Sequence, residues 1–363
     1  MKTVPTERAL IASLRRQTKN LPAAQVRSVR LGIGDDCAIL RIPARHEMLL
    51  TTDLSLETTH FRRDWHPPES VGHRCLARGL SDLAAMGAHP LAAFLSLALP
   101  RELMTAQRNR PSWRDRFFAG LLALAKEHRL PLAGGDTAQS PAGIRAGNTR
   151  SANTGPESTS IAIADIVLVG SAPRNRALLR SAAKAGDRIY VTGHLGGAAA
   201  ELAALAAHPR RFAKVTHASR LFAHPHLFPQ PRVAVGESLL ARRLATAAID
   251  ISDGLSTDLD HLCEESGLAA VIDVATLPIH PLAASEKNSL HLALHGGEDY
   301  ELLFTASAQT KIPRSIAGVP ITCIGQMQPA RRKQPRMQLL RRVGTRPVLE
   351  PLPTQGWEHY RER

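Results

Sequence analysis

The chain has 363 residues, of which 44% are hydrophobic and 21% charged, a balance typical of soluble globular proteins. This length exceeds what one ordinary hydrophobic core requires and predicts two domains. The sequence has no run of about 18 or more apolar residues, and its first residues lack the apolar core of a secretory signal. These absences argue against a membrane or secreted protein, and we expect a cytoplasmic one.

The chain is strongly basic, with 46 Lys and Arg against 32 Asp and Glu and a formal net charge of +14. Nucleic-acid binding is one interpretation, but the basic residues are widely spread, aromatic residues make up only 4%, and no known nucleic-acid motif occurs. We therefore expect no nucleic-acid partner and a general attraction for anionic substrates. The densest basic cluster, interpreted as a solvated loop or strand pair, comprises Arg331, Arg332, Lys333, Arg336, Arg341 and Arg342.

A first domain is predicted over residues 1–169. Apolar residues at helical spacing predict helices at 7–19, 70–86 and 113–129. Short apolar runs predict strands at 37–40, 48–52, 91–99 and 161–169. Residues 139–160 are rich in Gly, Ser, Thr, Asn and Pro, which predicts a long loop that we interpret as an insertion.

A second domain is predicted over residues 170–363. It opens with a strand at 187–193 that leads into a helix-like segment at 196–202. Strands that alternate with helices along the whole chain indicate an α/β fold.

Five short acidic motifs are distributed along the chain, each bounded by glycine or by a strand-like run. They are Gly32-Ile33-Gly34-Asp35-Asp36, Thr51-Thr52-Asp53, Leu80-Ser81-Asp82-Leu83, Gly134-Gly135-Asp136-Thr137 and Asp250-Ile251-Ser252-Asp253-Gly254-Leu255. A basic chain has no general reason to place bare aspartates in apolar stretches, so we expect a cation among them. Oxygen ligands without a nearby Cys or His pair favour Mg²⁺.

The residues of these motifs and their order along the chain resemble those of the thiamine-monophosphate kinase family. Two further segments support the resemblance, Gly296-Gly297-Glu298-Asp299-Tyr300-Glu301-Leu302 and the closing Gly356-Trp357. The family belongs to a superfamily that includes aminoimidazole ribonucleotide synthetase and selenophosphate synthetase. The resemblance covers most of the chain and implies a two-domain α/β fold like that of aminoimidazole ribonucleotide synthetase, with mixed sheets covered by helices. It also implies that the N-terminal domain binds metal and ATP and forms a dimer, while the C-terminal domain completes the nucleotide and acceptor sites.

The resemblance implies a set of metal ligands built from the acidic motifs. They are Asp36, Thr51, Thr52, Asp53, Asp82, Asp250 and Asp253. For Asp35, a turn-capping role and a ligand role both remain open. Asp136 follows two glycines, and we favour a metal or nucleotide contact for it over a plain turn.

The resemblance also implies the residues that contact the two substrates. The ATP contacts are Phe118, Gly135, Asp136, Arg180 and Ser252. Phe118 departs from the family, which tends to have a hydroxyl-bearing aromatic at this place. The acceptor contacts are His60, Glu298 and Trp357, although an isolated histidine among 16 is usually a surface or capping residue. No G-x-x-x-x-G-K-[ST] sequence occurs, so a Walker-type phosphate loop is excluded.

The implied activity is Mg²⁺-assisted transfer of the γ-phosphoryl group of ATP to thiamine monophosphate, which gives thiamine diphosphate and ADP. A phosphate acceptor is already ionised at neutral pH, so positioning and charge neutralisation must account for the rate enhancement. We expect no catalytic base and no covalent intermediate. One alternative is another enzyme of the superfamily, of the aminoimidazole ribonucleotide synthetase, selenophosphate synthetase or hydrogenase-maturation type. The other is a non-catalytic, basic nucleotide-binding protein.

Overall fold

The computed structural model describes residues 11–16, 28–33, 35–106, 111–141, 160–215 and 223–358. Its strands are β1 (Val29–Leu31), β2 (Ile39–Leu40), β3 (His46–Leu56), β4 (His89–Leu99), β5 (Leu132–Gln139), β6 (Ile163–Pro173), β7 (Arg188–Thr192), β8 (Ala247–Asp250), β9 (Leu268–Asp273), β10 (Leu302–Ala306), β11 (Ser315–Ile316), β12 (Val319–Pro329), β13 (Met337–Val343) and β14 (Arg346–Pro351). Its longer helices are α2 (Pro68–Ala85), α3 (Trp113–Glu127), α4 (Gly197–Ala207), α5 (Val233–Ala241), α6 (Leu255–Ser266), α7 (Pro281–Ala284) and α8 (Ser289–His295).

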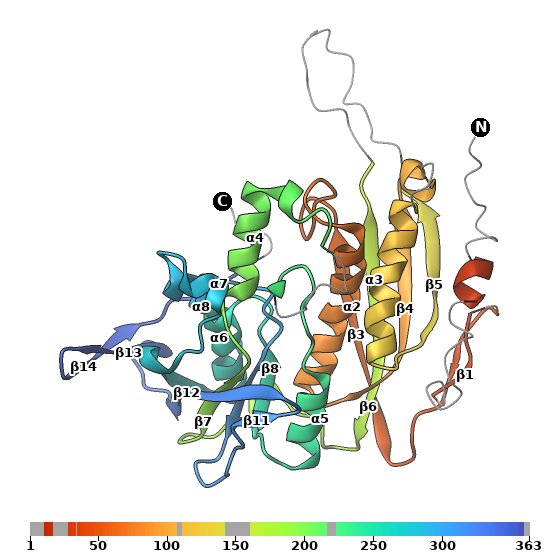
Figure 1. Cartoon of the computed structure of the whole chain (residues 1–363). Helices are drawn as coiled ribbons and strands as arrows, with labels where there is room; N and C mark the ends of the chain where they lie inside the picture. The colour runs from red at the N-terminus through yellow and green to blue at the C-terminus, as the bar shows by residue number, and fades with distance from the viewer. Residues whose placement is uncertain are drawn as a thin grey trace.

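The first half of the chain forms a four-stranded sheet in the order β3-β6-β4-β5, in which only β4 and β5 are parallel. Helix α2 packs on this sheet and α3 packs on α2 (Figure 1). The two helices cross closely because glycines lie at the crossing. A Cβ atom on Gly72 would lie 1.9 Å from the carbonyl oxygen of Phe117, and one on Gly120 would lie 1.9 Å from that of Glu69.

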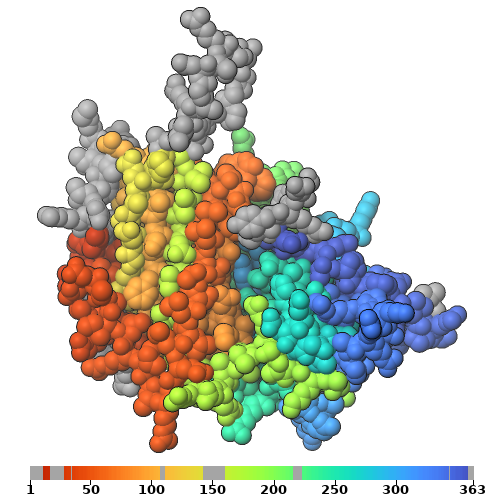
Figure 2. All heavy atoms as spheres, turned by 180° about the vertical axis from the view of Figure 1, so that it is seen from behind, coloured from red at the N-terminus to blue at the C-terminus, as the bar shows by residue number. Residues whose placement is uncertain are grey.

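The opposite face of this sheet is not covered by a helix in the described part of the chain. Figure 2 shows its four strands side by side at the surface. Side chains alternate along β3, so that Leu49, Thr51 and Asp53 point toward α2 whereas their neighbours point outward. Two of the outward side chains, Met48 and Leu50, are apolar and more than half exposed.

The second half of the chain forms a mixed sheet in the order β14-β13-β9-β12-β7-β10-β8, with β11 paired to β12. Its central strands are buried on both faces. Ile189 and Val191 belong to one hydrophobic cluster, which includes α6, whereas Tyr190 and Phe304 belong to the cluster that includes α2 and α5. Burial on both faces explains why the sequences of these strands are continuous apolar runs. It also shows that α2 lies between the two sheets.

The predicted α/β class, with two mixed sheets and covering helices, is confirmed. The helices predicted at 70–86 and 113–129 correspond to α2 and α3, and the strand at 91–99 corresponds to β4. The strand predicted to end the first domain at residue 169 is longer, because β6 keeps pairing with β3 as far as Pro173. The predicted domain boundary at 169/170 therefore falls within β6.

Two predicted segments lie largely outside the described residues. Of the helix predicted at 7–19, residues 11–16 are described and helical, and residues 142–159 of the predicted insertion are not described. The basic cluster lies on the β12–β13 turn and the β13–β14 hairpin, where Arg336 pairs with Asp260 at 2.9 Å. No helix in the described ranges is both long and apolar enough to cross a membrane.

Candidate functional site

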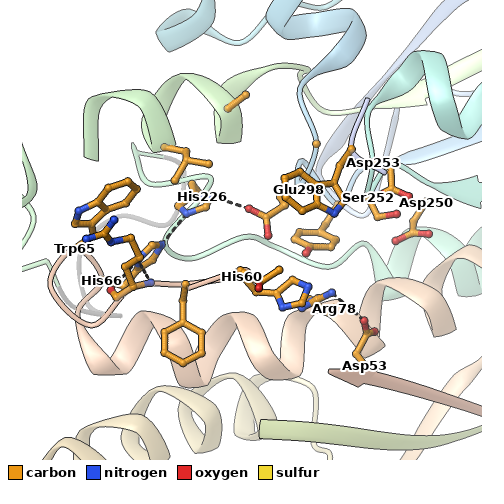
Figure 3. Close-up of a pocket in the computed structure, with 18 of the residues that line it drawn as sticks. Asp53, His60, Trp65, His66, Arg78, His226, Asp250, Ser252, Asp253 and Glu298 are labelled. Atoms are coloured by element: carbon orange, nitrogen blue, oxygen red, sulfur yellow. Dashed lines mark hydrogen bonds and ion pairs between the residues drawn. The ribbon is translucent and has the colours of Figure 1, made fainter. Parts of the chain in front are cut away.

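A pocket of about 550 Å³ lies between the two sheets and collects eight of the predicted site residues. These residues are Asp53, His60, Asp82, Asp250, Ser252, Asp253, Glu298 and Trp357. They come from β3, the segment after β3, α2, the end of β8, the β8–α6 turn, the segment before β10 and the C-terminal segment (Figure 3). Residues far apart in the sequence therefore share one cavity.

The acidic end of the pocket is formed by Asp53, Asp82 and Asp250. Burial raises the pKa of Asp53 and that of Asp250 to about 7, and the negative charge of Asp82 adds to both shifts. Two hydroxyl groups hold the carboxylates in place. Thr51 donates a hydrogen bond to Asp82, and Ser81 donates one to Oδ2 of Asp250 at 2.6 Å.

Burial and mutual repulsion are the two penalties that a bound cation would offset, so the acidic cluster suits a hard metal ion. Within the described ranges, however, no three His, Cys, Asp or Glu side chains are already arranged as a metal site. A metal ion held here would need further oxygen ligands from phosphate and water, as is usual for Mg²⁺. Burial raises the pKa values of Asp82 and Asp250, and the positive charge of Arg180 opposes both shifts, so this predicted ATP contact lies close enough to act on the cluster.

The turn that carries Ser252 and Asp253 is organised by a residue that the sequence analysis missed. The backbone N–H groups of Ser252, Asp253 and Gly254 all donate to Oδ2 of Asp258, each at 3.1 Å. Asp258 lies in the first turn of α6 and is buried. Asp258 therefore holds the turn in place. The backbone N–H of Trp357 donates a hydrogen bond to the carbonyl of Asp253 at 3.0 Å.

Glu298 lies in a strained backbone segment opposite this turn. Glu298 has φ +67° and Tyr300 has φ +49°, values that are uncommon for residues other than glycine and that often mark functional sites. The segment is held because the Glu298 N–H donates to the Ser252 carbonyl at 2.7 Å. Burial opposes the charge on Glu298, but its partners Arg74 and His226 outweigh burial and hold its pKa well below the usual range.

His60 is oriented by the backbone that precedes it. The Leu56 N–H donates to Nδ1 of His60 at 3.0 Å, so the neutral ring carries its proton on Nε2. Trp357 lines the pocket with 39% of its surface exposed. The three predicted acceptor contacts thus line the same pocket as the acidic cluster.

The other predicted residues are placed elsewhere. A second pocket of about 640 Å³ is lined by Asp36, Phe118, Gly135 and Asp136. Strands β3 and β5 are the two edges of the four-stranded sheet, so Asp53 and Gly135 are about 14 Å apart at the usual strand spacing. Thr52 points to the uncovered face, away from Thr51 and Asp53. Within one chain, the predicted metal and nucleotide ligands are therefore divided between the two pockets.

Two local contacts bear on the roles left open for the aspartates of the second pocket. Oδ1 of Asp35 accepts the Asp36 N–H at 2.9 Å, a contact of the kind expected for the turn-capping alternative. Oδ1 of Asp136 accepts the Thr137 N–H at 2.8 Å while the residue stays exposed.

Comparison with known proteins identifies relatives of the whole chain. Residues 34–155 match the model of the AIR synthase related protein N-terminal domain, and residues 184–315 match that of the C-terminal domain. The thiamine-monophosphate kinase of Salmonella typhimurium strain LT2 is 40% identical over 84% of this chain and 87% of its own length. That of Bacillus subtilis strain 168 is 31% identical over 92% of this chain and 94% of its own.

The chain belongs to the thiamine-monophosphate kinase family. The crystal structure of the thiamine-monophosphate kinase from Stenotrophomonas maltophilia K279a is similar, with a TM-score of 0.71 and 32% identity over 92% of this chain and 96% of that one. A structure of AaThiL complexed with AMPPCP and TMP has a TM-score of 0.67 at 24% identity, over 98% of this chain and 97% of that one, and shares the fold.

Family membership leaves several pocket residues without a predicted role. Arg74 and Arg78 precede Asp82 on α2 by eight and four residues, a helical spacing that could have revealed them. His66 and His226 meet at 3.0 Å between Nε2 atoms, and no sequence signal joined them because they lie 160 residues apart. In this member of the thiamine-monophosphate kinase family, both histidines line the same pocket as Glu298.

Proposed function

We propose that this chain transfers the γ-phosphoryl group of ATP to the phosphate of thiamine monophosphate and so forms thiamine diphosphate and ADP. The observation that carries the proposal is that one pocket joins the acidic cluster to His60, Glu298 and Trp357. Relatives that carry the name thiamine-monophosphate kinase and match most of the chain support it. We also place the protein in the cytoplasm, where such a biosynthetic reaction would occur.

Mg²⁺ is the metal that we propose for the acidic cluster. It would be held by oxygen atoms of Asp53, Asp82, Asp250 and Asp253, which line the pocket, and of Thr51, whose hydroxyl donates to Asp82. When bound, Mg²⁺ supplies neutralisation of the charge on the transferring phosphoryl group.

The residues of the chain itself would position the two substrates. Arg180 and Ser252 lie beside the acidic cluster, where the phosphates of ATP would be bound. Glu298 is ionised and can face the positively charged heteroaromatic ring of the acceptor, on which Trp357 can stack. The acceptor phosphate is already ionised, so correct placement replaces a general base.

We further propose that the protein is a homodimer whose active site uses both copies. The uncovered sheet face exposes Met48, Leu50 and Leu54, which a second copy could bury. A two-fold axis parallel to the strands would place β5 of one copy beside β3 of the other. The second pocket of the partner, with its Asp36, Phe118, Gly135 and Asp136, would then complete the nucleotide and metal site.

In this arrangement the first domain binds metal and ATP and forms the dimer, and the second domain completes the nucleotide and acceptor sites. No observation favours the non-catalytic alternative, because every acidic motif keeps its carboxylates.

An assay of product formation tests the proposed function. Purified protein is incubated with ATP, Mg²⁺ and thiamine monophosphate, and both ADP and thiamine diphosphate are measured. We expect the two products in equal amounts, and neither without the acceptor or with EDTA in place of Mg²⁺. Release of ADP that does not depend on thiamine monophosphate would contradict the proposal and favour another reaction of the superfamily.

A further inference from the structure

Three charged side chains form a row along one face of α2. Arg74, Arg78 and Asp82 are spaced by four residues, so each lies about 6 Å along the helix from the next. Arg74 pairs with Glu298, and Asp82 belongs to the acidic cluster. Arg78 therefore lies midway between the residue that would face the acceptor ring and the carboxylates that would hold the metal.

Two contacts direct Arg78 into the pocket. Its Nη1 donates to the carbonyl oxygen of Leu54 at 2.9 Å, and its Nη2 lies 3.3 Å from Oδ1 of Asp53. Figure 3 shows the guanidinium beside the His60 ring, with the ion pair to Asp53 drawn as a dashed line. Arg78 and His60 also line a small cavity next to the main pocket. A guanidinium carries five N–H donors, so these two contacts use only part of its capacity.

The surroundings of Arg78 keep it charged and partly accessible. Its side chain is 17% exposed and lines the main pocket. An arginine guanidinium stays protonated in proteins, and the carboxylate of Asp53 lies 3.3 Å from Nη2 of Arg78. A fixed positive charge thus lies where two negatively charged phosphates would approach each other.

The other arginine that lines the pocket, Arg62, makes its contacts away from the acidic cluster. Arg62 is paired with Asp64 at 2.8 Å, and its guanidinium lies 4.5 Å from the centre of the Trp65 ring. Its side chain is half exposed, at 50%. Among the described residues that line this pocket, Arg78 is thus the arginine near the acidic cluster.

We propose that Arg78 binds the phosphate group of the acceptor, as a specificity-determining residue that distinguishes the phosphorylated substrate from its free alcohol. The inference rests on the proposed function. A planar guanidinium can offer two parallel N–H donors to a phosphate, which Lys cannot do.

Binding measurements with and without the phosphate test the inference. Thiamine monophosphate and thiamine are titrated by calorimetry, directly or by displacement, into the wild type, Arg78→Gln and Arg78→Lys in Mg²⁺ buffer without ATP. Arg78→Gln should weaken thiamine monophosphate about ten- to a hundredfold and leave thiamine within about twofold, because only the phosphate contact is lost. Arg78→Lys should fall between, since it keeps the charge but loses the paired donors.

Arg242→Gln is the matched control, because it removes one positive charge from an exposed position next to α5. It should leave both affinities unchanged. Equal loss of both ligands in Arg78→Gln, or loss of neither, would overturn the inference, and Arg78→Lys gives the same decision if the glutamine variant does not fold. A wild type that does not bind thiamine monophosphate would instead refute the proposed function.

Discussion

Asp53 is a buried carboxylate that lies beside the negative charge of Asp82 and is a proposed metal ligand. Asp53→Asn should lower kcat by several orders of magnitude, because a neutral amide cannot hold Mg²⁺ as a carboxylate does. The melting temperature without Mg²⁺ at pH 8 should not fall. The reason is that burial and Asp82 raise the pKa of Asp53 to about 7, so its ionised form is unfavourable in the folded protein.

The two measurements together separate a functional role from a structural one. Glu350→Gln is the control, because Glu350 pairs with Arg341 on the exposed β13–β14 hairpin, and full activity is expected for it. Normal turnover of Asp53→Asn, with an unchanged dependence on Mg²⁺, would remove Asp53 from the site.

We expect Trp357 to contact the acceptor and not the nucleotide. Trp357→Ala should weaken thiamine monophosphate by about ten- to a hundredfold and change ATP affinity by less than about twofold, because a stacked ring contributes a few kcal/mol and its 39% exposure limits the buried area. Separate calorimetric titrations of the two ligands check this. A variant that binds both ligands as well as the wild type would show that another residue forms the acceptor pocket.

At the scale of elements, the close crossing of α2 and α3 positions Arg74, Arg78 and Asp82. Gly72→Ala should destabilise the fold by about 3 kcal/mol, the upper end of the usual cost of overpacking, because its Cβ would lie 1.9 Å from a backbone carbonyl of α3. Helix propensity alone predicts the opposite sign, a gain of about 1 kcal/mol.

Urea unfolding of the wild type and Gly72→Ala measures this difference. The sign of the change in the free energy of unfolding decides the outcome. A more stable variant would mean that α2 and α3 can move apart without cost, and the row of charged residues would then not depend on the crossing.

For the whole molecule, the proposed homodimer with a shared active site makes a prediction about mixed dimers. Asp53→Asn and Asp136→Asn should each be inactive alone. Each heterodimer of the two would contain one site with both aspartates intact, if Asp53 of one copy works with Asp136 of the other. Random mixing should therefore restore about a quarter of wild-type activity, since about half of the dimers are heterodimers with one intact site in two.

Co-expression of the two variants, or refolding of their mixture, followed by the kinase assay tests this. Different affinity tags on the two variants, with isolation through both tags, measure the fraction of heterodimers and so the exchange of subunits. If the mixture of the two variants stays inactive while subunits exchange, both aspartates must come from the same chain. The 14 Å separation across the sheet would then have to be spanned within one nucleotide site.

Local sequence was sufficient for much of the fold. Helix α2 was predictable because its buried residues recur at helical spacing, and β4 because an apolar run of that length suits a buried strand. The strand predicted at 37–40 was found as the shorter β2, and the full length of β6 was not predicted, since pairing with a neighbouring strand decides where a strand ends. Motif order over the whole chain also indicated the family.

The sequence by itself predicted which residue types would carry the chemistry, since aspartates in apolar stretches of a basic chain favour a cation and the order of the motifs resembles that of the family. Only the tertiary structure decided which of them meet. Strand alternation separates Thr52 from Asp53, sheet order separates Asp53 from Asp136, and the α2 crossing brings Arg78 to the centre of the pocket. The physical reason is that spacing along the chain specifies a local direction, whereas distance between elements depends on how the buried faces pack.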